Sequence, residues 1–416
     1  MKGSIATDVI VIGGGVSGLA AASLLRKSGV DCLILEGRGR VGGRIQTCND
    51  ESFAELGGEF IHGRAACTIS LAKMAGLRIE KYPLDVRTPR HYCYKGKIFS
   101  ETEQLGMRID ELYSMLRGYS GPDVSVGDYV QTIGDTKDPA LFFALERLIR
   151  VEAADLSKLS AKAIGKESDG LCAENDNYRI SRGYGSLLSW MLGDGEVELL
   201  KNVKRISWAK RGVRIWCDDD SRFSCNRVIV TLPLGVLQKN EALFVPRLPA
   251  IKARAIHRLV MGSVFKIVLW LSEHIGPEFS YFATDGLVRV WWRLDRNGQH
   301  CLVGYTAGPP AESIRGMTER AVLKMALEEL SVILCCKVAN SLRGYITKLW
   351  SADKWSLGGY SYTPVGGIGC RVELSRPVEK SLYFAGEATS TNGHVGTVHG
   401  AIESGWRAAR EVLDEP

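Results

Sequence analysis

The apolar residues at the start of the chain follow two different periods in succession. Residues 8–12 form a short β-branched run, which predicts a strand, and they lead directly into a glycine cluster at residues 13–18. The Ala-rich apolar stretch that continues to Leu25 is typical of a helix. A second apolar run, residues 31–35, predicts another strand and ends at Glu36. The pattern therefore predicts strand, glycine turn, helix and strand, in that order.

The glycines of this turn meet the requirements of a dinucleotide phosphate. Gly13 permits a tight turn, Gly15 lets the backbone approach a pyrophosphate, and Gly18 allows close packing of helix on strand. The helix would point its unpaired amides at the phosphates, and Glu36 is placed to accept hydrogen bonds from a ribose. The alternative is a glycine turn without a ligand, but the ordered elements favour a nucleotide site.

Later segments predict further pieces of the same site. Residues 203–207 and 227–236 fit the role of a third piece, and residues 382–390 read as a strand that enters a turn. Residues 396–405 then open a helix that continues to Val412. Because a strand followed by Gly-Glu and a helix can meet a dinucleotide from the far side, we expect both ends of the chain to build one site.

The fold class that follows is α/β, with a discontinuous Rossmann-like nucleotide-binding domain and an α+β substrate-binding domain. A chain of 416 residues is long enough for two domains. We expect the nucleotide-binding domain at residues 1–82, 196–255 and 354–416, and the substrate-binding domain at residues 83–195 and 256–353.

Composition and charge disfavour several other classes of protein. A chain that is 45% hydrophobic and 24% charged is typical of a globular protein, so disorder is not expected. The net charge of +6 is modest and its Lys and Arg are dispersed, which predicts no nucleic-acid partner. The 11 cysteines are irregularly spaced without a CxxC, which favours reduced thiols in the cytoplasm and disfavours a metal site. Residues 9–25 lack the features of a signal peptide or membrane span, so no membrane association is expected.

The continuation of the second strand carries the most specific resemblance to a known family. Residues 37–45, Gly-Arg-Gly-Arg-Val-Gly-Gly-Arg-Ile, resemble the second nucleotide motif of the flavin amine oxidase superfamily. The resemblance implies FAD as cofactor, with Arg38 near its adenosine half and Arg44 against the pyrophosphate and flavin. Two arginines suit a diphosphate, and Gly42 and Gly43 let the chain pass close to a flat ring.

The C-terminal half is similar to the same family. Residues 384–388, Phe-Ala-Gly-Glu-Ala, resemble its motif beside the ribityl or phosphate region, which implies that Gly386 and Glu387 contact the cofactor. The alternative for Glu387 is an ordinary helix-initiating acid. By the same resemblance, the Val398 amide lies near the flavin pyrimidine oxygen, where a helix N-terminus stabilises negative charge. Val203 opens the third segment of the expected FAD site.

Residues 55–63, Glu-Leu-Gly-Gly-Glu-Phe-Ile-His-Gly, resemble the segment of polyamine oxidases that runs along the flavin and ends in a pocket residue. His62 falls at that pocket position, where it would contact the substrate amine or shuttle a proton. A purely structural role for Glu59 and His62 is the alternative. Contacts with the cofactor are expected from Gly57, Gly58, Glu59 and Phe60.

Three further residues are implied at the reacting end. Lys266, inside the apolar run 262–270, resembles the family's lysine that holds a water against flavin N5; the alternative is an exposed residue of an alternating strand. Tyr360 and Trp350 resemble the aromatics that align the amine, and the alternative is that both fill a core. An aromatic wall also suits a partly cationic substrate.

Two departures from the monoamine oxidase pattern bear on the cofactor and the substrate. Gly359 stands where those enzymes carry a flavin-linked cysteine, so the FAD is expected to be non-covalent. Thr397 replaces the second cage aromatic, at the same helix start as the predicted flavin contact, and leaves room for a longer amine. Glu152 resembles an acidic pocket residue that would bind a distal ammonium, and a solvated helix face explains it equally well.

The resemblance covers the chain from Ile5 to the last helix. It implies that a polyamine, or another primary or secondary amine, is oxidised to an imine, which water then hydrolyses. In the same reaction O2 is reduced to H2O2. One alternative is an L-amino-acid oxidase, with Arg87 or Arg90 on the substrate carboxylate. Another is a catalytically silent FAD-binding interaction module. Histone demethylation is disfavoured because the sequence lacks the coiled-coil insertion and extra domain of those enzymes. No metal is implied, and the sequence leaves the particular amine and the oligomeric state open.

Overall fold

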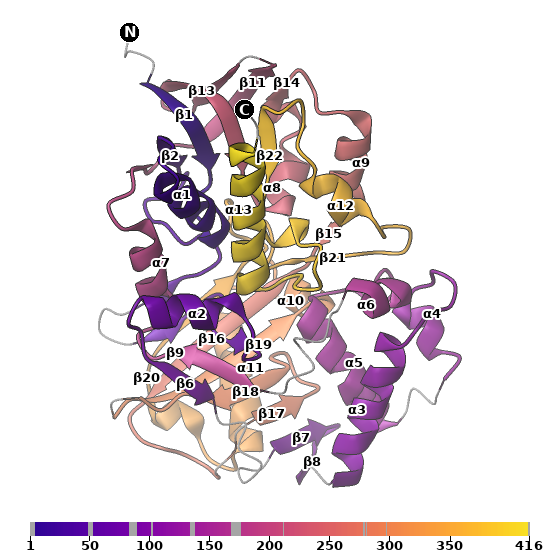
Figure 1. Cartoon of the computed structure of the whole chain (residues 1–416). Coiled ribbons are helices and arrows are strands. Elements are labelled where there is room, and N and C mark those ends of the chain that lie inside the picture. The colour runs from indigo at the N-terminus through magenta and orange to yellow at the C-terminus, as the bar shows by residue number, and fades with distance from the viewer. Residues whose placement is uncertain are drawn as a thin grey trace.

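The computed structural model of the protein contains two large β-sheets with helices packed against both (Figure 1). The described residues are 5–48, 53–82, 90–100, 103–133, 138–167, 176–210, 212–277, 279, 281–296 and 298–414.

The first large sheet collects strands from three separate parts of the chain. In spatial order they are β10 (Val197–Glu198), β2 (Cys32–Leu35), β1 (Ile5–Ile12), β13 (Arg222–Val230), β12 (Gly212–Cys217), β11 (Val203–Ala209) and β14 (Phe244–Val245), with β22 (Leu382–Phe384) paired to β13. β1, β2, β13 and β22 run parallel, and the register places Ile12 beside Leu35 and Val230, and Val230 beside Phe384. The carboxyl ends of these four strands therefore lie at one level.

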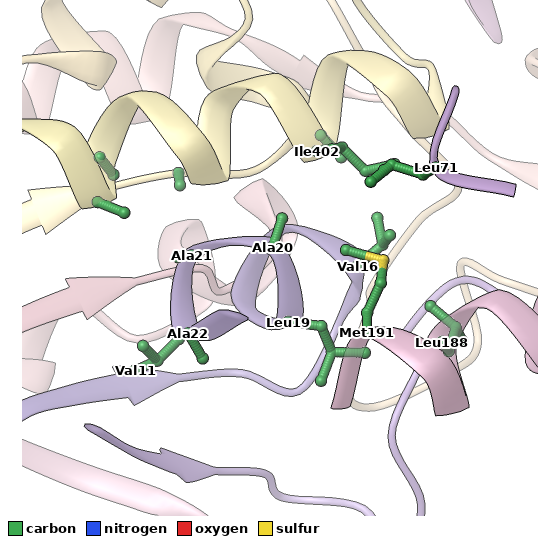
Figure 2. Close-up of a cluster of buried hydrophobic side chains, with 14 of the residues drawn as sticks. Val11, Val16, Leu19, Ala20, Ala21, Ala22, Leu71, Leu188, Met191 and Ile402 are labelled. Atoms are coloured by element: carbon green, nitrogen blue, oxygen red, sulfur yellow. The ribbon is translucent and has the colours of Figure 1, made fainter. Parts of the chain in front are cut away.

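Helix α1 (Val16–Lys27) covers this sheet and packs between α13 (Val398–Leu413) and α7 (Tyr184–Leu192). Figure 2 shows Ala20 of α1 on the side of α13, which contributes Ile402 to the cluster. The two helices approach so closely that a methyl group on Gly405 would lie 2.2 Å from the Ser17 carbonyl oxygen. The first and last helices of the chain thus form one layer on the sheet, as Figure 1 shows in indigo and yellow.

The second large sheet is mainly antiparallel. Its spatial order is β20 (Leu342–Leu349), β16 (Val264–Leu271), β19 (His300–Ala307), β18 (Val290–Arg293), β17 (Tyr281–Thr284), β7 (Arg90–Tyr94) and β8 (Lys97–Ser100). Its apolar face packs on α11 (Glu319–Ile333), through residues such as Ile267 and Leu302. β16, the strand predicted around Lys266, lies inside this sheet, and the register places Lys266 directly opposite Tyr305 of β19.

The remaining elements connect the two sheets or cover their edges. The small sheets pair β3 (Thr47–Cys48) with β4 (Ala54–Glu55), β15 (Val260–Met261) with β21 (Ser361–Tyr362), and β9 (Asn177–Ile180) with β5 (Ile61–His62) and β6 (Ile79–Tyr82). The other helices are α2 (Cys67–Met74), α3 (Glu103–Arg117), α4 (Val126–Val130), α5 (Pro139–Glu152), α6 (Ala161–Glu167), α8 (Leu234–Lys239), α9 (Ala250–Arg258), α10 (Pro309–Ser313) and α12 (Cys370–Ser375), with short 3-10 turns η2 (Glu241–Leu243), η3 (Val338–Asn340) and η4 (Glu387–Thr389). Helices α3 to α6 form a separate group beside β7 and β8 (Figure 1).

The mixed α/β architecture agrees with the predicted fold class. The first large sheet draws its strands from residues 5–35, 197–245 and 382–384, and the second from residues 90–100 and 264–349. The exact domain boundaries remain a prediction. Within the described ranges, no helix has the length and apolar character needed to cross a membrane.

Candidate active site

A connected cavity of about 760 Å³ opens where the parallel strands end. Ile12, Leu35 and Thr231 line it at the ends of β1, β2 and β13, and it extends to Lys266 and Tyr360. Ligands of parallel α/β sheets bind at the carboxyl ends of the strands. The cavity therefore joins the expected nucleotide position to the antiparallel sheet, and every predicted site residue except Gly18 lines it.

Some of the predicted glycines allow tight backbone packing, and others leave open space for a ligand. Gly13 has a φ of +110°, and a methyl group on Gly18 would lie 2.0 Å from the Gly13 carbonyl oxygen. By contrast, an added methyl group on Gly15 or Gly386 would meet no atom within 4 Å, and both residues line the cavity. The backbone at the start of α1 is thus open to a ligand, which fits a pyrophosphate held by helix amides. We call Gly15 and Gly386 the glycine cradle.

The expected ribose acid, Glu36, is held in place by backbone amides. Its two carboxylate oxygens accept hydrogen bonds from the Gly14 amide at 2.7 Å and from the Arg38 amide at 2.8 Å. The Arg38 side chain forms a two-pronged ion pair with Asp353, at 2.9 and 2.6 Å, and Asp353 also contacts Lys348 at 2.6 Å. Burial opposes ionisation of Asp353, but the two cations outweigh it and hold its pKa well below its usual value. A carboxylate oxygen has two lone pairs, so Glu36 can still accept ribose hydroxyls.

Arg44 and Glu387, both predicted to contact the cofactor, contact each other. Arg44 donates to the Glu387 carboxylate at 2.8 Å and to the Gly359 carbonyl at 2.7 Å. The other Glu387 oxygen accepts from the Ser361 hydroxyl at 2.8 Å. Burial acts to raise the pKa of Glu387, but Arg44 and Arg371 outweigh it and lower that pKa, so this acid is ionised at neutral pH. Arg371 was missed from the sequence because it lies outside the predicted motifs.

The N-terminus of α13 borders the cavity, and Thr397 caps it. The Thr397 hydroxyl accepts from the Gly400 amide at 3.0 Å and donates to the His394 carbonyl at 2.8 Å. An added methyl group on Gly58 would lie 2.9 Å from the Val398 side chain, so the flavin-side segment runs against this helix start. Thr397 therefore has a structural function, as an N-cap, that its resemblance to a cage position did not predict.

Two tyrosine hydroxyls meet at the reacting end. The Tyr360 and Tyr305 oxygens lie 2.8 Å apart, and Tyr360 also donates to the Arg150 carbonyl. Burial raises the pKa of Tyr305 to about 12 and that of Tyr360 well above its usual value, so both hydroxyls stay neutral. Trp350 is buried and donates its ring N–H to the Leu56 carbonyl at 2.9 Å. Tyr305 was missed from the sequence, although it lies opposite Lys266 in the strand register.

Phe60 and His62 lie on the same segment of the cavity wall. The Phe60 ring lies 5.1 Å from Tyr82 and 5.7 Å from Trp292, measured between ring centroids. His62 Nδ1 lies 2.7 Å from the Asn177 side-chain oxygen, and burial lowers the pKa of His62, which is therefore neutral at neutral pH. We give the name aromatic lobe to five of the aromatic residues that line the cavity: Phe60, Trp292, Tyr305, Trp350 and Tyr360.

Lys266 is buried and ion-paired. Its side chain is 3% exposed, and its Nζ donates to Glu59, whose carboxylate also pairs with Arg179. The interpretation of Lys266 as an exposed residue of an alternating strand is therefore wrong. Burial would raise the pKa of Glu59, but Arg179 and Lys266 outweigh it and hold that pKa below its usual value. The cavity thus carries a buried ionised cluster beside the Trp292 ring, whose centroid lies 5.4 Å from Nζ.

Glu152 ends α5 and lines the same cavity, half-buried. Burial raises its pKa to about 7, while Arg371 lowers it and Glu167 raises it by smaller amounts. Its position in the cavity wall favours the pocket interpretation over a solvated helix face, and the role of Glu152 stays a prediction. At neutral pH the Glu152 side chain therefore exists in both protonation states.

The arginines named for a substrate carboxylate give no support to that alternative. Arg87 lies outside the described residues, and for Arg90 only the backbone, at the start of β7, is described. Arg150 lies beside the two tyrosines instead, with its guanidinium 5.2 Å from the Tyr281 ring centroid. Val203 lines the cavity at the start of β11. Across the described residues, no group of three or more His, Cys, Asp or Glu is arranged to hold a metal ion.

Comparisons with known proteins agree with this geometry. A family model described as flavin containing amine oxidoreductase matches residues 16–137 and 125–413. Polyamine oxidase 2 of Arabidopsis thaliana is 28% identical over 438 residues, which cover 97% of this chain and 87% of that protein. Lysine-specific histone demethylase 1 homolog 2 of the same plant is 30% identical, over 98% of this chain and 58% of the relative. The chain thus spans about half the length of the demethylases that it matches.

The fold has solved counterparts. The structure of wild-type putrescine oxidase bound to putrescine superposes with a TM-score of 0.85 at 22% sequence identity, covering 99% of this chain and 100% of that chain. At this identity the likeness shows the fold alone.

A substitution at Gly15 tests whether the cofactor occupies the space beside this residue, without a large change in the stability of the fold. Thr is about as good as Gly at a helix N-cap, so Gly15→Thr should leave the unfolding midpoint of the ligand-free protein close to that of the wild type. Its side chain would occupy the open space beside the backbone, so we expect the purified variant to lose most of its flavin absorbance. Full flavin content in Gly15→Thr would show that the cofactor does not approach this turn.

Proposed function

The chain belongs to the family of flavin containing amine oxidoreductases, and from that premise we propose that it oxidises a small amine, with O2 as the final electron acceptor. The products would be an imine, which water hydrolyses to an aldehyde and ammonia or a smaller amine, and H2O2. The observation that carries the proposal is the connected cavity, because it joins the glycine cradle to the aromatic lobe and Lys266.

The cofactor is FAD, which when bound supplies the acceptor for a hydride from the carbon next to the amine nitrogen. Several features of the chain suit a tightly but non-covalently held dinucleotide. Gly359 offers no thiol for a covalent bond, and an added side chain there would lie 2.3 Å from Val264. Glu36, Arg38 and Arg44 are already fixed by partners, so little further ordering is needed on binding.

The aromatic lobe would select the reactive form of the substrate. A neutral amine nitrogen carries the lone pair that makes its neighbouring carbon a hydride donor, and an apolar cavity raises the cost of the ammonium form. The neutral hydroxyls of Tyr305 and Tyr360 are fixed by their mutual hydrogen bond. His62 is neutral and held at Nδ1 by Asn177, so it is placed to accept a proton from an arriving ammonium.

Lys266 would hold a water at the reacting end. Its ammonium has three donors, and one of them is directed at Glu59. The remaining donors can orient a water for imine hydrolysis and place a positive charge where O2 gains electrons. This assignment rests on the position of Lys266 in the cavity wall and on the family resemblance.

Glu152 would bind the far end of a diamine or polyamine. It lines the cavity, and its carboxyl is close enough to Tyr360 to affect the pKa of that hydroxyl. Arg150 beside the same tyrosine keeps an amino-acid substrate as the alternative, since its guanidinium could pair with a carboxylate. The demethylase relatives add a methylated lysine side chain as a third amine class to test.

A peroxide-coupled screen tests the proposal and separates its alternatives. The panel contains putrescine and longer polyamines, primary monoamines, L-amino acids and a methyllysine peptide. We expect peroxide with polyamines or monoamines and none from Gly15→Thr, which serves as the flavin-depleted control. If only the amino acids are turned over, the protein is an L-amino-acid oxidase and the proposal is wrong. If the flavin-loaded protein releases no peroxide with any compound of the panel, it is an FAD-binding module without catalytic activity.

The Glu152 carboxyl predicts a pH dependence for diamines. Its pKa is raised to about 7, so the negative charge that attracts a distal ammonium is present above that pH and is lost as the pH falls through it. The ratio of KM for a diamine to KM for a monoamine of equal length should therefore fall by about tenfold, about 1.4 kcal/mol, as the pH rises through neutrality. Because the reacting nitrogen titrates in both substrates, its effect on KM cancels in this ratio. In Glu152→Gln the ratio should be independent of pH, and an unchanged slope would remove Glu152 from the substrate site.

A further inference from the structure

Three charged side chains meet at the wall of the cavity. Glu59 is almost fully buried, with its side chain 4% exposed, and its two carboxylate oxygens contact the Lys266 ammonium and the Arg179 guanidinium. Lys266 comes from β16 of the antiparallel sheet, and Arg179 comes from β9 of the three-stranded sheet. The segment that carries Glu59 therefore lies between two cations from distant parts of the chain.

Arg179 is connected to the cavity through Glu59 and through two aromatic rings. Its guanidinium lies between two rings, 4.5 Å from the Phe60 centroid and 4.1 Å from the Tyr82 centroid, and its side chain is 13% exposed. Unlike Lys266 and Glu59, Arg179 does not line the cavity. The two rings and the carboxylate fix the guanidinium in one place, and any effect it has on the reaction must pass through its neighbours.

The charges of this cluster do not cancel. The Glu59 pKa lies below its usual value, so the carboxyl is ionised at neutral pH, and two cations share one anion. With Arg179 present, the cluster carries one net positive charge; without it, Glu59 and Lys266 would form a neutral pair. A further buried acid, Glu55, lies near this cluster and accepts hydrogen bonds from the Tyr184 amide at 2.7 Å and the Thr47 hydroxyl at 2.9 Å. Burial raises the pKa of Glu55 to about 7, and Lys266 and Glu59 change it by smaller amounts, so the net charge of the cluster counts only Glu59, Lys266 and Arg179.

We infer that Arg179 is a positioning residue of the reacting centre, which through Glu59 fixes the Lys266 ammonium at the cavity wall and keeps the ion cluster at one net positive charge. The contacts of the Arg179 guanidinium with the two rings would by themselves give this residue only a role in fold stability. The shared carboxylate makes Arg179 matter for the electrostatics of the cavity, because a net charge in a dry site acts over several ångströms. The inference rests on the proposed function in taking this cavity as the flavin site.

The midpoint potential of the bound flavin, measured by dye equilibration in the holoprotein, tests the inference without any substrate. Removing a positive charge near a flavin makes its reduced, anionic form less stable. We therefore expect Arg179→Met to lower the potential in the same direction as Lys266→Met, and Arg179→Lys to restore it. Arg179→Gln is a second neutral variant if Arg179→Met does not retain flavin, and it should lower the potential in the same way.

Arg293→Met is the matched control. Arg293 is also buried and lies on a ring, 4.5 Å from the Phe279 centroid, but it donates to backbone carbonyls and does not line the cavity. It should lower the thermal unfolding midpoint and leave the potential unchanged. A potential that is unchanged in the neutral Arg179 variants, or lowered equally in Arg293→Met, would overturn the inference and leave Arg179 with a structural role.

Single-turnover kinetics supply the second readout. Because Arg179 does not line the cavity, Arg179→Met should slow the reduction of the flavin by an amine substrate at least about tenfold, while the amine concentration for half-saturation stays the same. A change in half-saturation alone would contradict positioning through Glu59. If none of the amines tested reduces the flavin of the wild-type protein, the proposed function fails. The midpoint potentials of the variants still decide the role of Arg179 in that case.

Discussion

The rest of the structure depends on the level at which four parallel strands end. The pairing of Ile12 with Leu35 and Val230, and of Val230 with Phe384, places four strand ends, and the turns that follow them, around one cavity. The close packing of α13 on α1 then holds the two ends of the chain together, since a methyl group at Gly405 would collide with α1. Residues separated by most of the sequence reach a common ligand because of this register.

The side chains around the cavity are already held by one another. Amides fix Glu36, Asp353 fixes Arg38, and Arg44 pairs with Glu387. Such a site has little conformational freedom left to lose when it binds a dinucleotide, which favours tight binding without a covalent link. At the reacting end the same rule applies to the tyrosine hydroxyls and to the cluster around Glu59.

The sequence predicted the site residues that lie in contiguous motifs and missed the partners that lie outside those motifs. The glycine turn, its flanking strands and the motif around Glu387 are contiguous signals, and the structure brings them to one cavity. Arg179 and Asp353 have no such signal, because each acts on a partner more than a hundred residues away, and only the folded chain shows those pairs. Thr397 was interpreted from its aligned position, which cannot show that its hydroxyl caps a helix.

The most direct test of the account is anaerobic mixing of the flavin-loaded protein with the amine preferred in the screen. The account predicts that the absorbance of oxidised flavin disappears in proportion to the amine added, and that O2 restores it with an equal amount of peroxide. A flavin that remains oxidised with every amine, although dithionite reduces it, would contradict amine oxidation at this cavity.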